Sequence, residues 1–140
     1  MQVVLDMREK ELEERQMEMA KVLSALNSQR EKLQMILTAQ EDNKNQLEEL
    51  TNSSNLDITQ IEMHRNYGIK LIADAKNQER IIQNTEAILE RKQQEVIEAH
   101  QKVEVLKKLK EKQEKEYYKE FLSTETKEID DITSARFRFQ

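Results

Sequence analysis

The chain has 140 residues, of which 36% are charged and 4% aromatic, and its formal net charge is −5 at pH 7. This composition is typical of a coiled coil and does not supply the apolar residues of a globular core. The chain has no cysteine, one glycine and no proline. Thiolate metal sites and glycine-rich phosphate loops are therefore excluded.

The net charge and the hydropathy pattern also exclude some classes of partner and argue against a membrane-spanning protein. A negative net charge argues against nonspecific binding to nucleic acid or to anionic lipid. No apolar run approaches the roughly 20 residues that a membrane-spanning helix needs. We therefore expect a cytoplasmic protein that binds no nucleic acid and does not insert directly into a membrane.

The first predicted helix covers residues 2–51 and carries an apolar heptad repeat. A seven-residue apolar period requires a partner helix along its length. We call this repeat the first seam row of the first helix. Its members are Leu5, Leu12, Met19, Leu26, Leu33, Gln40 and Leu47.

A turn is predicted at residues 52–57. Asn52, Ser53, Ser54 and Asn55 form a cluster of side chains that compete for backbone hydrogen bonds. Asp57 then has the character of an N-cap, and Gln60 three residues later completes a capping-box pattern.

The second predicted helix covers residues 58–134 and carries a matching repeat. The first seam row of this helix consists of Ile61, Gly68, Ala75, Ile82, Leu89, Val96 and Val103. If the chain folds back once, the two rows pair antiparallel, with Leu26 opposite Ile82. We therefore predict one all-α domain over residues 1–140, a long antiparallel two-helix coiled-coil hairpin in which helix two overhangs helix one. Such a hairpin carries its own partner helix and is expected to be a monomer on its own.

Gly68 falls opposite Gln40 in this pairing, and two interpretations remain open. A glycine inside a helix costs about 1 kcal/mol relative to alanine. Gly68 is either a tolerated break in the seam or the floor of a local groove for a partner.

Helix two continues past Val103 without a partner in the chain. Residues 107–119 are nearly all lysine, glutamate and glutamine, which suits a solvated single helix. Apolar residues then return at helical spacing, at Tyr118, Leu122, Ile129 and Ile132. An apolar stripe that the chain does not cover predicts a binding surface.

No group of residues suggests catalysis or a cofactor. His64 and His100 lie far apart on one predicted helix and have no cysteine partners, so a metal site is not expected. Acidic pairs occur, but a two-helix hairpin offers no dry pocket to raise a carboxyl pKa. We expect no catalytic, cofactor-binding or metal-binding residues, and no enzyme activity.

The two ends of the sequence resemble those of the FliJ family, the small coiled-coil components of the bacterial flagellar type III export apparatus. The amino-terminal resemblance is residues 2–16 (QVVLDMREKELEERQ), similar to the opening helix of the family. The carboxy-terminal resemblance consists of residues 116–122 (EYYKEFL), residues 127–132 (KEIDDI) and Arg136-Phe137. Helix one, a polar turn and a longer helix two also match the family, so the resemblance spans essentially the whole chain.

The resemblance implies a function that periodicity alone does not. Family members are similar to the central stalk of rotary ATPases, and they insert into the hexameric export ATPase and stimulate it. They also link the ATPase to the cytoplasmic domain of the export gate membrane protein, and they bind export chaperones. It implies a location at the inner face of the cell membrane at the flagellar base. The ATPase contact is expected on Tyr118, Leu122, Ile129 and Ile132. The gate contact is expected on Lys32, Ile36, Gln40, Tyr67, Leu71 and Gln78.

Three other interpretations compete with this one. The first is the equivalent stalk protein of a virulence-type secretion system. The second is a structural homodimer in which both helices join into one continuous coiled coil. The third is a hairpin chaperone of the prefoldin type, which would need a strand-forming insert at the turn, and no alternating β-branched run exists there.

Overall fold

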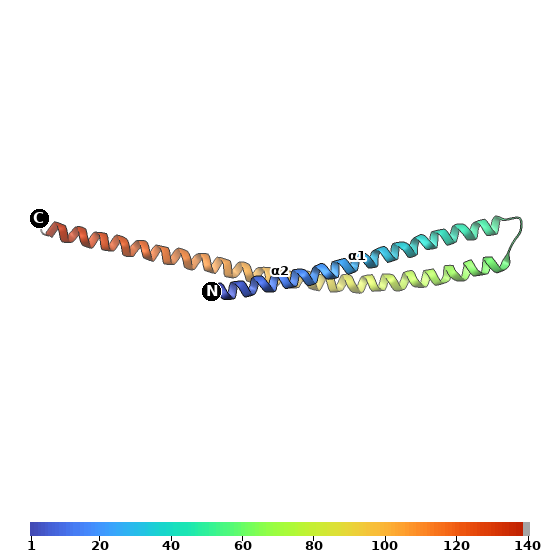
Figure 1. Cartoon of the computed structure of the whole chain (residues 1–140), viewed down its shortest axis with the longest axis horizontal. Helices are drawn as coiled ribbons and strands as arrows, with labels where there is room; N and C mark the ends of the chain where they lie inside the picture. Colours follow the sequence, from blue (N-terminus) through green and yellow to red (C-terminus); the bar gives the residue numbers. More distant parts are fainter. Residues whose placement is uncertain (139–140) are drawn as a thin grey trace. The chain divides into compact units, whose positions relative to one another are not determined.

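The computed structural model describes the backbone of residues 1–138 and the side chains of residues 1–136. Helix α1 spans Gln2–Asn52, with 51 residues, and helix α2 spans Ile58–Arg138, with 81 residues. The two helices pack against each other as an antiparallel hairpin (Figure 1). The predicted fold class is confirmed, with the second helix the longer of the two. The homodimeric alternative is wrong in its fold, because the two helices are separated by a turn and pair within one chain.

The turn between the helices is built from short polar side chains. The Asp57 carboxylate accepts a hydrogen bond of 3.2 Å from the Gln60 N–H, and the Asp57 carbonyl accepts one of 3.0 Å from the Ile61 N–H. Asp57 is therefore the N-cap of α2, as its position before the apolar repeat predicts. At the other side of the turn, the Thr51 hydroxyl donates to the Leu47 carbonyl at 2.7 Å.

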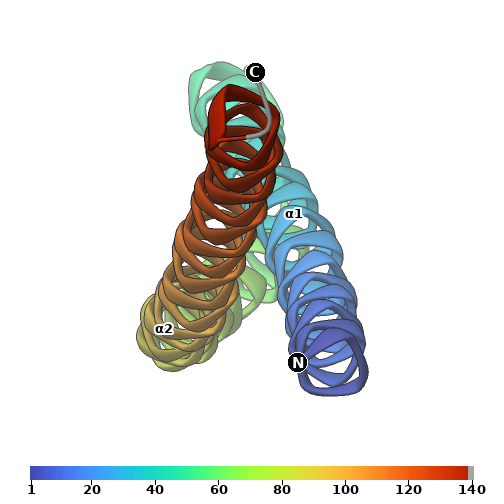
Figure 2. The ribbon, with the colours of Figure 1, turned by 90° about the vertical axis from the view of Figure 1, so that its left-hand side faces the viewer.

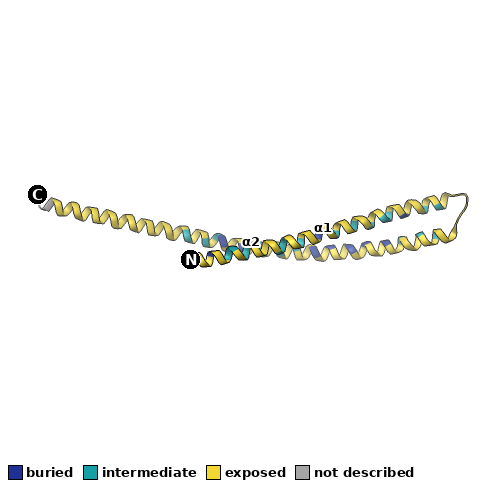
Figure 3. Ribbon diagram, in the orientation of Figure 1, coloured by how far each residue is buried: buried dark blue, intermediate teal, exposed yellow. Residues whose placement is uncertain are grey.

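The chain divides into two compact units. One unit is Arg15–Val96, in which the larger part of α1 lies beside the first half of α2. Its core is a seam between the helices that includes Leu26, which is 1% exposed, together with the buried Leu71, Ala75 and Ile82. In Figure 3 the buried and half-buried residues of this unit follow the facing sides of the two ribbons.

The seam has a second row of residues, three positions after the first. We call it the second seam row. On α1 it consists of Arg8, Arg15, Val22, Gln29, Ile36, Asn43 and Leu50, and on α2 of His64, Leu71, Gln78, Thr85, Lys92, Ala99 and Leu106. All of these residues are buried or half-buried except Arg15. Two rows per helix are the normal seam of a coiled coil, in which heptad positions a and d both face the partner.

The other unit combines Met1–Glu14 with Ile97–Gln140. Leu5, Ala99 and Val103 are buried in it, and Lys110 donates a hydrogen bond from its ammonium group to the Gln2 side-chain oxygen. Every residue from 111 to 136 is exposed, and we call residues 111–136 the exposed segment of α2. The helix is continuous through it, as the orange-to-red coil of Figure 2 shows. The side chain of Phe137, which belongs to the carboxy-terminal motif, lies outside the described residues.

Within residues 1–138, neither helix contains a stretch long and apolar enough to cross a lipid bilayer. The seam instead depends on its periodic apolar positions.

Candidate interaction surfaces

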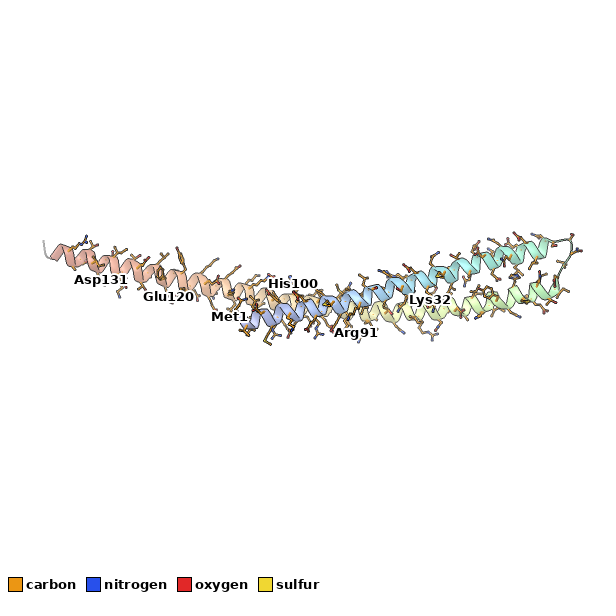
Figure 4. All side chains as sticks on the ribbon, in the orientation of Figure 1. Met1, Lys32, Arg91, His100, Glu120 and Asp131 are labelled. Atoms are coloured by element: carbon orange, nitrogen blue, oxygen red, sulfur yellow. The ribbon has the colours of Figure 1, made fainter. Side chains whose placement is uncertain are left out.

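The exposed segment of α2 carries large apolar side chains that no described residue covers. Tyr118 is 63% exposed, and Leu122, Ile129 and Ile132 are also exposed. Tyr117 and Phe121 add two more exposed aromatic rings. Figure 4 shows side chains projecting around this segment, where Glu120 and Asp131 are labelled. The structure therefore places all four predicted ATPase contacts on one uncovered helical segment.

Met1, the residue before α1, borders this segment. Met1 lines a shallow hollow together with Lys110, Gln113, Tyr117 and Tyr118. Residues 107–119 are mainly lysine and glutamate, whereas residues 125–131 are mainly acidic. A partner would thus meet a mixed-charge stretch, then aromatic rings, then an acidic stretch with isoleucines.

A second hollow, of about 330 Å³, lies beside Gly68 in the unit Arg15–Val96. Apolar atoms come from Leu47, Ile69 and Ile72, and basic groups come from Lys44 and Arg65. The remaining lining residues are Gln40, Asn43, His64 and Gly68. Ile69 and Ile72 are both more than half exposed, so this hollow has an apolar wall open to solvent.

The six residues predicted to contact the export gate are divided between the surface and the seam. Lys32, which Figure 4 labels on α1, is exposed, and Tyr67 is 46% exposed. Ile36 and Gln40 are half-buried. Leu71 and Gln78 are only 5% and 3% exposed, because both belong to the second seam row.

Asn43 and His64 form a polar pair inside the seam. The Asn43 side-chain amide donates to the His64 carbonyl at 2.9 Å, and its oxygen lies 2.9 Å from the His64 Nδ1. Because an amide oxygen only accepts, the second contact is a hydrogen bond when Nδ1 carries the proton. Asn43 is buried, so both of its polar atoms have partners on the opposite helix.

Gly68 lies against this pair. A Cβ atom at Gly68 would be 3.0 Å from the Asn43 Nδ2, the same nitrogen that donates to His64. The glycine therefore makes room for the asparagine side chain in the seam. The sequence suggested that Gly68 is a tolerated break in the seam or the floor of a groove. The contact with Asn43 is a third explanation for a glycine at this position.

A second polar pair lies fourteen residues away on each helix. The Gln78 side-chain amide donates to the Gln29 carbonyl at 2.9 Å. The Gln29 Oε1 atom is buried and has no hydrogen-bond partner among the described residues. A buried glutamine in this position is energetically costly unless it has another use.

A charged cluster lies a further fourteen residues along each helix, at Arg15 on α1 and Lys92 on α2. Lys92 on α2 contacts Glu18 on α1 at 3.2 Å and Glu95 on its own helix at 3.4 Å, and Arg15 contacts Glu18 at 3.3 Å and Glu95 at 4.0 Å. The Lys92 hydrogen bond, followed by that of Arg15, lowers the pKa of Glu18, and the Glu18 hydrogen bond raises the pKa of Lys92. Two like charges are thus joined through two carboxylates.

The sequence predicts the first seam row, but not that the polar residues of the second seam row face the partner helix. Of this row, Ile36, Leu71 and Gln78 were expected on the gate surface. Its other polar members were not predicted to face the partner helix: Arg8, Arg15, Gln29, Asn43, His64, Thr85 and Lys92. For Arg15, Gln29 and Asn43 on α1, and for His64, Gln78 and Lys92 on α2, the signal in the sequence is a spacing of fourteen residues.

The described side chains contain no group of three histidine, cysteine, aspartate or glutamate residues arranged to hold a metal ion. The exposed segment of α2 and the hollow beside Gly68 are the two candidate surfaces for binding other proteins.

Comparison with known proteins identifies the family. The model of the FliJ family, described as flagellar FliJ protein, matches residues 1–140. Searches of curated proteins and of solved structures gave no match. The flagellar description decides between the flagellar and the virulence-type alternatives, and it makes the protein a non-catalytic component. The chain, with its hairpin of unequal helices, therefore belongs to the FliJ family of coiled-coil components of the bacterial flagellar export apparatus.

Proposed function

We propose that this protein inserts the exposed segment of α2 into the central opening of the hexameric export ATPase and stimulates its activity. The observation that carries the proposal is the set of uncovered apolar residues Tyr118, Leu122, Ile129 and Ile132. Burying each of these side chains against a partner would contribute roughly 1.5–3 kcal/mol. Family membership supports the export apparatus as the source of that partner.

The test is the double substitution Leu122→Asp with Ile129→Asp. Both residues lie in the exposed segment and contribute nothing to the buried seam, so the hairpin should keep its helicity. Losing two apolar contacts and burying two charges should weaken binding about a hundredfold or more. The measurement is ATP turnover and ring assembly of the purified ATPase with wild-type or substituted protein.

A matched control adds the same charge to the other side of the segment. On a helix of 3.6 residues per turn, Ser123 and Ser134 lie about 100° and 120° from Leu122, on the side away from the apolar stripe of Tyr118, Leu122, Ile129 and Ile132. Ser123→Asp with Ser134→Asp should leave stimulation nearly unchanged. Undiminished stimulation by the Leu122/Ile129 variant, with its helicity retained, would place the ATPase contact elsewhere.

We further propose that the surface around Tyr67 binds the cytoplasmic domain of the export gate. Lys32, Ile36, Gln40 and Tyr67 are the candidate contacts, and the hollow beside Gly68 adds Ile69 and Ile72 as an exposed apolar wall. Leu71 and Gln78 would support this surface from within the seam. Tyr67→Ala with Lys32→Ala should weaken binding to the isolated gate domain, whereas Leu122→Asp with Ile129→Asp should not.

The proposal includes export chaperones as partners and a position at the cytoplasmic side of the flagellar base. Both rest on family membership. Binding of a purified chaperone to the wild-type protein, with loss of binding in one of the two surface variants, would assign the chaperone contact to a surface. Equal binding by both variants would place that contact outside them.

A further inference from the structure

Within the unit Arg15–Val96, polar pairs of the second seam row alternate with pairs that present carbon atoms, in the same register on both helices. Arg8, which lies outside this unit, departs from the alternation. Asn43 is opposite His64, and Gln29 is opposite Gln78, as their hydrogen bonds show. By the same register Ile36 falls opposite Leu71, between these two pairs. Val22 falls opposite Thr85, whose hydroxyl donates to the Ile81 carbonyl at 3.0 Å and is satisfied within α2. Each polar pair is therefore followed by a pair that presents carbon atoms.

The first seam row does not by itself select one register of α1 against α2. Its residues recur every seven positions and are apolar apart from Gln40 and Gly68. If α1 slid by one heptad along α2, most of its apolar residues would again meet apolar residues. A seven-residue repeat by itself permits such slipped pairings.

The second seam row forbids a slip of one heptad. In one direction Asn43 would fall opposite Leu71, and Ile36 would fall opposite Gln78. In the other direction Ile36 would fall opposite His64, and Gln29 would fall opposite Leu71. Either slip leaves buried amide groups against aliphatic side chains, where they lose hydrogen bonds and regain none. Only a slip of two heptads restores polar-to-polar pairing.

The charged cluster opposes a slip of one heptad in one of the two directions. Arg15 and Lys92 are at the same level and share Glu18 and Glu95. A slip of one heptad in one direction separates this set and places Val22 at the level of Lys92. A slip in the other direction places Thr85 at the level of Arg15, but it brings the Arg8–Glu11 ion pair to the level of Lys92 in place of Arg15 and Glu18. The three polar levels thus have a period of fourteen residues, twice that of the apolar seam.

We propose that the polar levels Asn43/His64, Gln29/Gln78 and Arg15/Lys92 are a register lock that selects one pairing of α1 and α2. The lock determines how much of α2 lies beyond the start of α1. A slip of one heptad would move that start by seven residues, about 10 Å at 1.5 Å per residue. The contact of Gln2 with Lys110 and the border of the exposed segment would both move with it. Gly68 belongs to the lock, because it makes room for Asn43.

Disulfide crosslinking reads the register directly, because the chain has no cysteine of its own. Ala75→Cys is combined in turn with a cysteine at Leu33, Leu26 or Gln40 on α1. In the native register Leu33 is opposite Ala75, as Leu26 is opposite Ile82. A crosslink of Ala75→Cys to Leu26→Cys or to Gln40→Cys would instead indicate that α1 is shifted by one heptad, in one direction or the other. Crosslinks within one chain at high dilution require Cα atoms within about 7 Å.

The variant that removes the lock replaces two levels by leucine, with Gln29→Leu, Asn43→Leu, His64→Leu and Gln78→Leu. In the wild-type background we expect crosslinking of Leu33→Cys at least about tenfold faster than at the two offset positions. In the leucine variant the three rates should come within about threefold of one another, while its melting temperature rises, because a buried polar level lowers stability. The control Asn43→His with His64→Asn keeps a polar pair and should keep the native register.

A second variant moves the lock instead of removing it. His64→Leu, Leu71→His, Gln78→Leu and Thr85→Gln shift the two polar levels of α2 by one heptad. Crosslinking of Ala75→Cys should then move from Leu33→Cys to Gln40→Cys. If the leucine variant aggregates, this variant decides alone. Crosslinking that stays exclusively at Leu33→Cys in either variant would overturn the proposal and assign the register to the turn at Asp57.

Discussion

Gly68 affects the stability of the hairpin in two ways, through the propensity of its own helix and through its contact with Asn43. In sequence it is a helix-weakening residue inside α2, and glycine costs about 1 kcal/mol relative to alanine at such a position. In the structure its missing Cβ leaves room for the Asn43 amide, which is hydrogen-bonded to His64. Helix propensity and side-chain packing therefore act in opposite directions on any substitution here.

The first prediction separates these two effects. In an Asn43→Ala background, Gly68→Ala should raise the free energy of unfolding by about 1 kcal/mol, because only the propensity gain remains. In the wild type the gain should be reduced or lost, since the Asn43 amide must move and its hydrogen bond, worth about 1 kcal/mol, weakens. Urea unfolding of the four proteins of this double-mutant cycle measures the coupling. Equal gains in both backgrounds would show that Asn43 does not restrict position 68.

The second prediction concerns Glu18 and Lys92. The pKa of Glu18 is lowered from its ordinary value of 4.5, chiefly by the hydrogen bond from Lys92. Its contribution to stability is therefore present above pH 4.5 and is lost as the pH falls through the lowered pKa. The pKa of Lys92 is raised from 10.5, so its contribution is present below that pH and is lost as the pH rises through the raised pKa.

Thermal melting from pH 7 to pH 3 tests this directly. The wild type should lose more melting temperature on acidification than Glu18→Gln, which has no carboxyl group at this position to protonate. Because the cluster is open to solvent, the difference should be small and should shrink in high salt. Parallel curves for the two proteins would mean that the cluster contributes no pH-dependent stability.

At the scale of elements, the two helices exist because their apolar residues can be buried only against each other. Leu26 is almost completely buried, and Ile82 is buried on the opposite helix. Isolated helices gain little stability from propensity alone, so the seam supplies most of the free energy that holds α1 and α2 together. The Asp57 cap at the start of α2 adds about 1 kcal/mol.

The third prediction tests the hairpin through this pair. Leu26→Cys with Ile82→Cys should form a disulfide within one chain, since the seam brings the two residues to one level. The crosslink closes a long loop and should raise the melting temperature of the oxidised protein over the reduced one. The measurement is the gel mobility of the oxidised protein at high dilution. Only intermolecular products would contradict the pairing of α1 with α2.

At the scale of the whole molecule, stability is unevenly distributed along the chain. Among residues 1–136, the buried ones all lie from Leu5 to Val103, whereas residues 111–136 are exposed throughout. A segment without buried contacts opens with little free energy compared with a packed seam. The part of α2 available to a partner is therefore also the least stable part of the described chain.

The fourth prediction follows from this distribution. On heating, the helical signal should first fall gradually by about a fifth as the exposed segment melts, and then cooperatively as the seam separates. A variant ending at Leu106 should lose the gradual phase and keep the cooperative midpoint within a few degrees. Circular dichroism at 222 nm measures both phases. A large drop in the midpoint of the shortened variant would mean that the exposed segment stabilises the seam.

The two helices, the fold-back and the uncovered carboxy-terminal stripe can all be predicted from the order of residues along the chain. A repeat from Leu5 to Leu47 and another from Ile61 to Val103 require a mutual partner, and the polar residues before Asp57 allow the turn. The absence of cysteine and the single glycine removed most chemistry from consideration. These conclusions depend on local pattern and composition, which can be read residue by residue.

The role of the second seam row is visible only in the packing of α1 against α2. A stripe of apolar residues shows that a helix has a buried side, but not whether the polar residues three positions later face the partner or the solvent. Leu71 and Gln78 looked available for a partner and are buried, and Gly68 looked weak and makes room for Asn43. The physical reason is that a polar side chain can be buried only if its hydrogen-bond partner is in place, and that partner lies on the other helix.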